Sequence, residues 1–204
     1  MANLQAPFGL KPSRYRDGTA WNGATNLYWI PASDTNQYNV GDTVLTAAGG
    51  DANGIPQIVK DTAGTATIRG VIAGILISAP NLPNIQGINL DLTVQNAPAT
   101  KARDYYALVV DDQGVLFEAQ DDGITTANLV AASSNKNASL TVANPTSPQQ
   151  NSASVINSSS IATTATLNLK LMGLKQAPGN AYGAYATWIV MINQHELMGG
   201  TAGH

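Results

Sequence analysis

The chain contains no cysteine and few charged residues, and both absences narrow what it can do. Without a thiol, disulfides, thiolate catalysis and thiolate metal ligands are all excluded. Only 11% of the 204 residues are charged, against about 25% in an average soluble domain. A surface so poor in charge is weakly protected against self-association. This predicts that other subunits cover much of the surface, with a merely neutral, adhesive surface as the alternative.

Basic runs, histidines and long apolar segments are also scarce. The ten Lys and Arg residues form no run and the formal net charge is −3, so we expect no nucleic-acid partner, because neutralising phosphates needs clustered base. Two histidines without cysteine argue against a zinc site. The longest apolar runs are too short to cross a bilayer, and the first residues lack the apolar core of a signal peptide. We therefore expect no metal, cofactor or membrane partner, and synthesis in the cytoplasm.

Short β-rich segments separated by turn residues run through the chain and predict an all-β fold. An antiparallel β-sandwich or barrel, jelly-roll-like, is typical of strands at this spacing. The segment 122–134 also allows one short helix, capped near Thr125 or Thr126. The expected strands lie at residues 25–31, 41–46, 55–59, 66–77, 88–94, 104–110, 115–120, 166–174 and 185–197.

The last expected strand is apolar on both faces. Trp188, Val190 and Ile192 alternate with Ile189 and Met191. Because a strand that is apolar on both faces is covered on both sides, we predict that it lies in the centre of a sheet.

We assign residues 25–204 to a single β-rich domain. Two regions differ in composition from the rest of the chain, one before this domain and one inserted within it. Residues 1–24 hold Pro, Gly and three of the ten basic residues, which predicts an extended N-terminal arm lying on a partner, or the first edge strand of the chain's own sheet. Near 131–166, nineteen of thirty-six residues are Ser, Thr or Asn. This predicts a long polar loop or a β-rich insertion, ordered by a neighbouring subunit.

The stretch DDQGVLFEAQDD carries four aspartates in two pairs, Asp111 with Asp112 and Asp121 with Asp122. They flank one expected strand, whose six residues at about 3.3 Å each separate the pairs by about 20 Å. That distance is too long for a glycosidase carboxylate pair, and the spacing is not that of an EF-hand. We interpret them as solvated turns available for polar contacts, with a weak cation site as the alternative.

No catalytic motif is present, which predicts that the chain is not an enzyme. G-x-S-x-G, G-x-x-x-x-G-K-[ST] and G-x-G-x-x-G are all absent, and His195 beside Glu196 is interpreted as a polar pair at a strand end. Aromatic side chains in strands are more often core or interface anchors than sugar-binding platforms. The aromatic residues concerned are Trp21, Tyr28, Trp29, Tyr105, Tyr106, Tyr182, Tyr185 and Trp188.

Three stretches, spread over the length of the chain, carry a resemblance to a known family. The first is MANLQAPFGLKPSRYRDGTAWNGATNLYWIP, with its APFGL start. The second is DYYALVVDDQGVLFEAQDDG, a hydrophobic strand followed by an acidic turn. The third is ATLNLKLMGLKQAPGNAYGAYATWIVMINQHEL, with a PGNAYG turn and Asn-x-His near its end. In their order and spacing these stretches resemble small head proteins of tailed bacteriophages, and the region 131–166 departs from the family pattern.

The resemblance implies a cement or decoration protein of the virion, on the capsid surface. Such β-rich proteins form homodimers or homotrimers, bind outside the lattice of the major capsid protein and stabilise the expanded head, which needs no active site. Another virion component, such as a minor capsid or fibre-base protein, and a carbohydrate-binding adhesion module are the alternatives. The acidic turns would pair with basic capsid residues. For shell or subunit contact we predict Phe8, Leu10, Arg14, Tyr15 and Arg16 of the arm.

Overall fold

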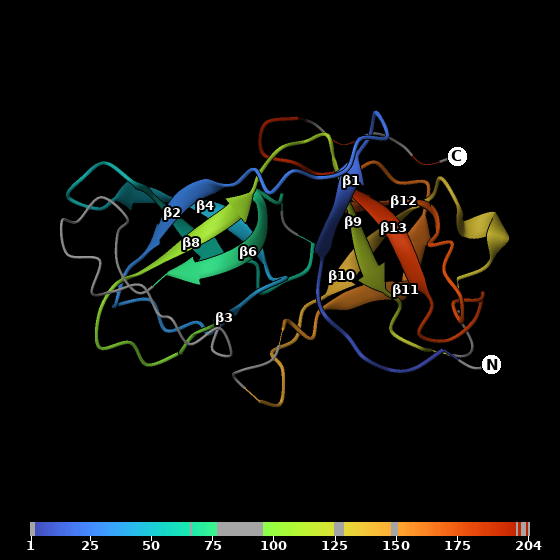
Figure 1. Cartoon of the computed structure of the whole chain (residues 1–204), viewed down its shortest axis with the longest axis horizontal. Helices are drawn as coiled ribbons and strands as arrows, with labels where there is room; N and C mark the ends of the chain where they lie inside the picture. Colours follow the sequence, from blue (N-terminus) through green and yellow to red (C-terminus); the bar gives the residue numbers. More distant parts are fainter. Residues whose placement is uncertain are drawn as a thin grey trace.

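The computed structural model describes residues 3–65, 67–76, 96–124, 129–147, 151–198, 200 and 203. Within these residues the chain forms thirteen β-strands and one 3-10 turn, Ala131–Ser133. The predicted all-β fold is confirmed. Figure 1 shows two β-rich bodies side by side along the long axis of the molecule.

The first body is a closed five-stranded barrel. Its strands are β2 (Asn26–Ile30), β4 (Thr43–Gly50), β5 (Pro56–Lys60), β6 (Gly70–Leu76) and β8 (Tyr105–Val110), in the order β2-β5-β4-β6-β8. Strand β2 closes the barrel by pairing antiparallel with β8 and parallel with β5. Ile30, Ile58 and Ile72 are fully buried inside it, because alternate residues of each strand point inward.

The second body is a six-stranded antiparallel sheet. Its strands are β1 (Lys11–Tyr15), β9 (Val115–Gln120), β13 (Thr187–Ile192), β12 (Leu169–Leu174), β10 (Asn137–Thr141) and β11 (Val155–Ala162), in the order β1-β9-β13-β12-β10-β11. Strand β13 lies between β9 and β12, so its predicted central position is confirmed. A small ladder of β3 (Tyr38–Asn39) and β7 (Asn96–Ala97) accompanies the barrel.

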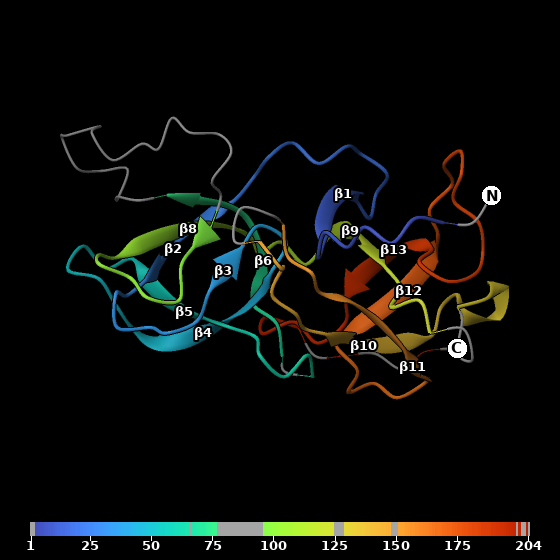
Figure 2. The same cartoon turned by 90° about the horizontal axis from the view of Figure 1, so that it is seen from below.

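The six-stranded sheet curls so that β11 reaches the end of β9. Asp121, just after β9, forms a bridge with Ile156 of β11, and the main-chain N–H of Asp122 donates to the Ile156 carbonyl at 3.1 Å. The curled sheet, visible in Figure 2, encloses Phe117, Trp188 and their neighbours.

The two bodies share apolar side chains. Val71 of β6 and Val110 of β8 belong to strands of the barrel, and Ile68 lies just before β6, yet all three are buried in the core of the curled sheet. The turn of residues 111–114 then leads directly from β8 into β9. The barrel therefore packs against the sheet through a continuous apolar contact.

The N-terminal segment takes part in this chain's own sheet. Residues 11–15 form the edge strand β1, paired antiparallel with β9, so the edge-strand alternative holds for these residues. The outer side of β1 is partly covered by the chain's own return, since the Tyr15 N–H donates to the Thr19 carbonyl at 2.8 Å.

Two strands, β10 and β11, lie in the polar region 131–166, in agreement with the β-rich alternative, while its other described residues form turns and loops. Strand β10 pairs with β12 on one side and with β11 on the other. The chain's own sheet supplies main-chain partners to both strands, and contact of this region with a neighbouring subunit stays a prediction.

Two expectations fall outside the described residues: the strand at 88–94 and the helix cap at Thr125 or Thr126. In the part of the chain that the structure describes, no helix has the length and apolar character needed to span a bilayer.

Candidate functional site

The five predicted contact residues differ in how much of their surface is available. Arg14 and Arg16 are exposed, and Phe8 is half-buried. Tyr15 packs partly against the sheet core and donates its hydroxyl to Asn22 Oδ1 at 2.9 Å. Leu10 is only 1% exposed and lies inside the core. Leu10 is therefore a core residue of this chain, and its assignment as a contact residue is corrected.

Asp111 is held inside the molecule, so the prediction of a solvated turn is wrong for this residue. Its carboxylate accepts hydrogen bonds from the Tyr28 hydroxyl at 2.6 Å, Asn26 Nδ2 at 2.8 Å and the Arg69 guanidinium at 3.1 Å. Burial, together with the Asp111 carboxylate, raises the pKa of Tyr28 to about 12. The carboxylate ties β2 and Arg69 to the end of β8.

Asp121 is fully buried, so the solvated-turn prediction is wrong here too. Its Oδ1 accepts the main-chain N–H of Gly123 at 2.9 Å and of Tyr185 at 2.6 Å. Burial raises the pKa of the Asp121 carboxyl, opposed by these N–H donors. This side chain connects the end of β9 to the segment that precedes β13.

Asp122 holds β11 against the end of β9. Its carboxylate accepts the Ser158 hydroxyl at 2.6 Å and the Ser158 N–H at 3.2 Å. Asp112 alone of the four aspartates is exposed, and it accepts the N–H of Gly114 in the tight turn at 2.6 Å. Three of the four aspartates thus act within the fold, and a polar contact with a partner remains open to Asp112.

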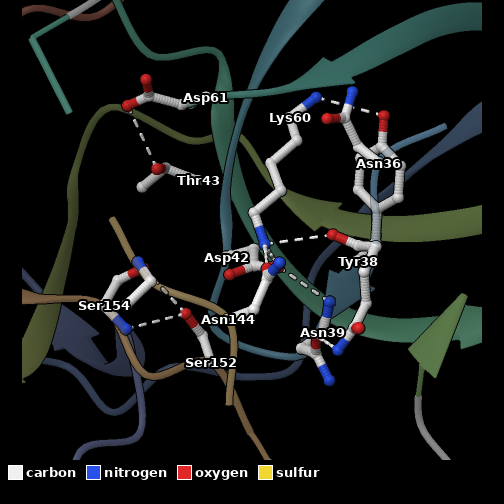
Figure 3. A network of polar contacts seen from close by, with 12 residues as sticks. Asn36, Tyr38, Asn39, Asp42, Thr43, Lys60, Asp61, Asn144, Ser152 and Ser154 are labelled. Carbon is white, nitrogen blue, oxygen red and sulfur yellow. Dashed lines mark hydrogen bonds and ion pairs between the residues drawn. The ribbon is translucent and has the colours of Figure 1, made fainter. Parts of the chain in front are cut away.

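A buried ion pair of the barrel also contacts the polar region 131–166 (Figure 3). No sequence motif predicted this ion pair. Lys60 Nζ lies 2.6 Å from Asp42 Oδ2, and the two side chains are 4% and 0% exposed. The same Nζ donates to the Gln37 carbonyl at 3.1 Å and to Asn144 Oδ1 at 2.7 Å. Burial raises the pKa of Asp42, and Lys60 opposes that shift.

The Lys60 ammonium is fully used by these contacts. An ammonium has three N–H donors, and a carboxylate, a carbonyl and an amide oxygen accept them. It lines a pocket of about 280 Å³ together with Gln37 and Asn144, but it has no donor left for an anion there. This group therefore fastens β5 to the region around Asn144.

His195 and Glu196 have separate partners, so the interpretation of a polar pair is replaced. Glu196 accepts both the N–H and the hydroxyl of Thr46 on β4. His195 is 2% exposed, and its Nδ1 accepts the Leu197 N–H at 3.1 Å. Burial, and next the charge of Arg69, lower the pKa of His195. The Glu196 carboxylate fastens the C-terminal segment to β4, whereas the His195 ring bonds within its own segment.

The aromatic side chains are largely internal. Tyr28, Tyr106 and Trp188 are buried, whereas Tyr182 is 48% exposed and its ring lies 5.8 Å from that of Trp188. The described residues therefore show these aromatics mainly as core anchors.

Three exposed basic side chains lie on the edge strand β1 or directly after it. Lys60, Arg69, Lys101 and Lys175 all form ion pairs. In contrast, Lys11, Arg14 and Arg16 are exposed, and the described residues provide them with no ion pair. We call these three side chains the basic edge.

An apolar pocket lies next to the basic edge, at the junction of the two bodies. Its volume is about 250 Å³. Phe8, Trp21, Val40 and Ala73 contribute apolar walls, and Lys11 of the basic edge also lines it. We call it the junction pocket. With the basic edge it forms the candidate functional site, a binding surface formed by the N-terminal segment.

The described residues contain no group of three or more His, Cys, Asp or Glu side chains that could hold a metal ion. No family model, curated protein or solved structure matches the chain. The argument about function therefore rests on the residues and on their arrangement.

Proposed function

We propose that this chain is a non-enzymatic structural protein of a virion, which binds the outside of the major capsid lattice and stabilises the expanded head of a tailed bacteriophage. Its partners would be the major capsid protein and further copies of itself, as a homodimer or homotrimer. The proposal starts from the resemblance of three sequence stretches to small phage head proteins.

One structural observation carries the proposal furthest. The three resembling stretches lie far apart in sequence, yet they supply β1, β9, β13 and β12, which are consecutive neighbours in one sheet. The first two stretches also supply β2 and β8, which pair in the barrel. A resemblance that arose by chance in three separate segments has no reason to fall on adjoining strands.

The region that departs from the family pattern lies to one side of these strands. Strands β10 and β11 occupy the opposite end of the sheet from β1. An insertion there leaves the neighbours β1, β9, β13 and β12 in place, so the departure is compatible with the resemblance.

The chemistry of the described residues fits a binding role. Three of the four aspartates in the acidic stretch, the Lys60 ammonium and the His195 ring are all engaged within the fold. Many copies that each bind the expanded shell better than the unexpanded one would stabilise it by mass action.

The test is co-sedimentation of the purified full-length protein with capsids stripped of their accessory proteins. We expect saturation near the number of major capsid subunits, or a simple fraction of it. We also expect the loaded capsids to release their DNA at a higher temperature than bare ones.

The alternatives give different results in the same experiment. A handful of copies per particle would indicate a minor capsid or fibre-base protein. Absence of binding to any capsid would overturn the proposal. The adhesion-module alternative loses support because most of the aromatic rings that suggested it are buried or half-buried.

A further inference from the structure

We propose that the basic edge and the junction pocket together bind an acidic polypeptide segment with one bulky apolar side chain. The apolar side chain enters the junction pocket, and the flanking carboxylates pair with Lys11, Arg14 and Arg16. If the proposed function holds, on which the identity of the partner rests, this segment belongs to the major capsid protein.

The charge of the basic edge is the first argument. Three of the ten basic residues lie within six positions of sequence at one sheet edge. All three are exposed, whereas Lys60, Arg69, Lys101 and Lys175 each have an acidic partner. In a chain with so few charges, three exposed cations at one edge favour a partner that brings carboxylates.

The junction pocket supplies the second argument. Its exposed lining is mainly apolar, and it opens between the N-terminal segment and β6. Ligand pockets occur preferentially at the junctions between structural units. A bulky side chain in a desolvated pocket, surrounded by a polar rim, is the usual arrangement of a binding hot spot.

Lys11 links the two features, because it belongs to the basic edge and also lines the junction pocket. An apolar side chain in the pocket therefore brings its neighbours in sequence to the basic edge. The outer side of β1 is partly occupied by residues 19–21 of its own chain. Recognition would therefore use side chains and not the addition of a strand.

Acidic polypeptide is favoured over nucleic acid for two reasons. The exposed carboxylates of Asp17 and Asp112 lie beside the basic edge, since Asp17 follows Arg16 and the Arg16 N–H donates to the Gly114 carbonyl of the Asp112 turn. A peptide can place its few carboxylates opposite the three cations and away from Asp17 and Asp112, whereas a phosphate backbone carries a charge at every nucleotide and would be repelled by both. A nucleic acid also has no aliphatic or phenyl side chain to fill an apolar pocket.

The experiment measures binding of a fluorescein-labelled peptide to the full-length protein by anisotropy. The probe is a nine-residue peptide with a central Leu-Phe pair flanked by Asp and Glu. Two control peptides replace Leu-Phe by Ala-Ala, or the acidic residues by Lys. A duplex DNA of similar net charge is the fourth probe.

Charge-reversal variants measure what the basic edge contributes to binding, separately from the junction pocket. Arg14→Glu combined with Arg16→Glu should weaken binding of the acidic peptide by about tenfold or more, because attraction becomes repulsion. Arg103→Glu is the matched control, since Arg103 is also exposed but lies before β8, and it should change affinity by less than about twofold. Binding should weaken as salt rises.

Two different pocket variants are tested, so that a folding defect in one of them does not decide the result. Thermal melting checks that each variant is folded. Phe8→Ala removes a wall of the junction pocket, and Ala73→Leu fills it from β6. Both variants should bind the Leu-Phe peptide more weakly and should bind the Ala-Ala peptide with unchanged affinity. Failure of the acidic peptide to bind would overturn the inference. Equal binding of the Ala-Ala peptide or of the DNA would also overturn it, because the surface would then be a general polyanion site.

Capsid co-sedimentation with the same variants distinguishes this inference from the proposed function. If the Arg14 and Arg16 variant occupies capsids as the unchanged protein does, the inference fails and the proposed function stands. If the peptide results hold but no capsid binds, the proposed function fails and the acidic-segment site stands.

Discussion

The barrel and the curled sheet close in different ways. Strand β2 pairs with both β5 and β8, so a main-chain ladder closes the barrel. The curled sheet joins β9 to β11 through a single main-chain bridge between Asp121 and Ile156, supported by the side-chain bonds of Asp122 to Ser158. Main-chain closure tolerates many sequences, whereas closure by carboxylates depends on particular residues. The curled sheet should therefore be more sensitive to single substitutions at its seam.

The two bodies also differ in how independent their cores are. The barrel core is built from barrel strands and the β3–β7 ladder. The sheet core includes Val71 and Val110, which come from barrel strands. Because this core needs the barrel to be folded, we expect the two bodies to unfold in one cooperative transition.

The largest expected effect comes from the sheet core. Trp188 is fully buried on the central strand β13, so Trp188→Ala should lower the free energy of unfolding by about 3 to 5 kcal/mol through the cavity it leaves. Denaturant titration followed by circular dichroism measures this. Trp188→Phe should cost much less, because it also removes an indole N–H that has no acceptor among the described residues. Two separate transitions in Trp188→Ala would contradict the shared core.

The next effect concerns the tie between the barrel and the polar region. Lys60→Met leaves the buried Asp42 carboxylate without its cation and should cost about 3 kcal/mol of unfolding free energy. Adding Asp42→Asn should recover part of this loss, because the amide is neutral.

At acidic pH, Lys60→Met should lower the free energy of unfolding by less than it does at neutral pH. The pKa of Asp42 is raised in the folded protein, so the folded state binds the proton more tightly than the unfolded state, whose carboxyl titrates near its ordinary value. The stability contributed by protonation is fully present below that ordinary pKa and is lost as pH rises through the folded pKa. A destabilisation by Lys60→Met that is independent of pH would argue against this tie.

The seam of the curled sheet can be compared with the turn at the other end of β9. Asp122→Ala removes the acceptor of two Ser158 donors and should cost about 2 kcal/mol. Asp112→Ala makes the same change in an exposed turn and should cost about 0.5 kcal/mol. Hydrogen exchange should show faster opening of β11 in Asp122→Ala alone. Equal costs for the two variants would remove the distinction between a structural and a solvated aspartate.

The smallest effect is a pH dependence at the junction. The pKa of His195 is lowered in the folded protein by burial and by Arg69, so the unfolded state binds the proton more readily. The stability that the neutral His195 ring contributes is fully present above the ordinary histidine pKa of about 6.5, and it is lost as pH falls through the pKa of His195 in the folded protein. His195→Gln should flatten this part of the stability curve. Denaturant titration at several pH values gives the free energy of unfolding against pH for the unchanged protein and for His195→Gln. Identical slopes of the two curves would exclude His195 as the source of the pH dependence.

The sequence by itself determined the all-β fold and most of its strands. Alternation of apolar and polar residues is a local property, and the period of two is set by the pleat of a strand. It located the barrel strands, β9 and β12, and the two apolar faces of β13 placed that strand in the centre of a sheet. Exposure of Arg14 and Arg16 also follows from local polarity.

Only the tertiary structure decided which polar side chains meet. Asp111 lies 83 positions from Tyr28, and Lys60 lies 84 positions from Asn144, so no local pattern links either pair. The same holds for Leu10, which the sequence placed in an arm and the structure placed in a core. The partner of a charged or apolar side chain depends on which strands become neighbours, and that order results from packing the whole chain around its two cores.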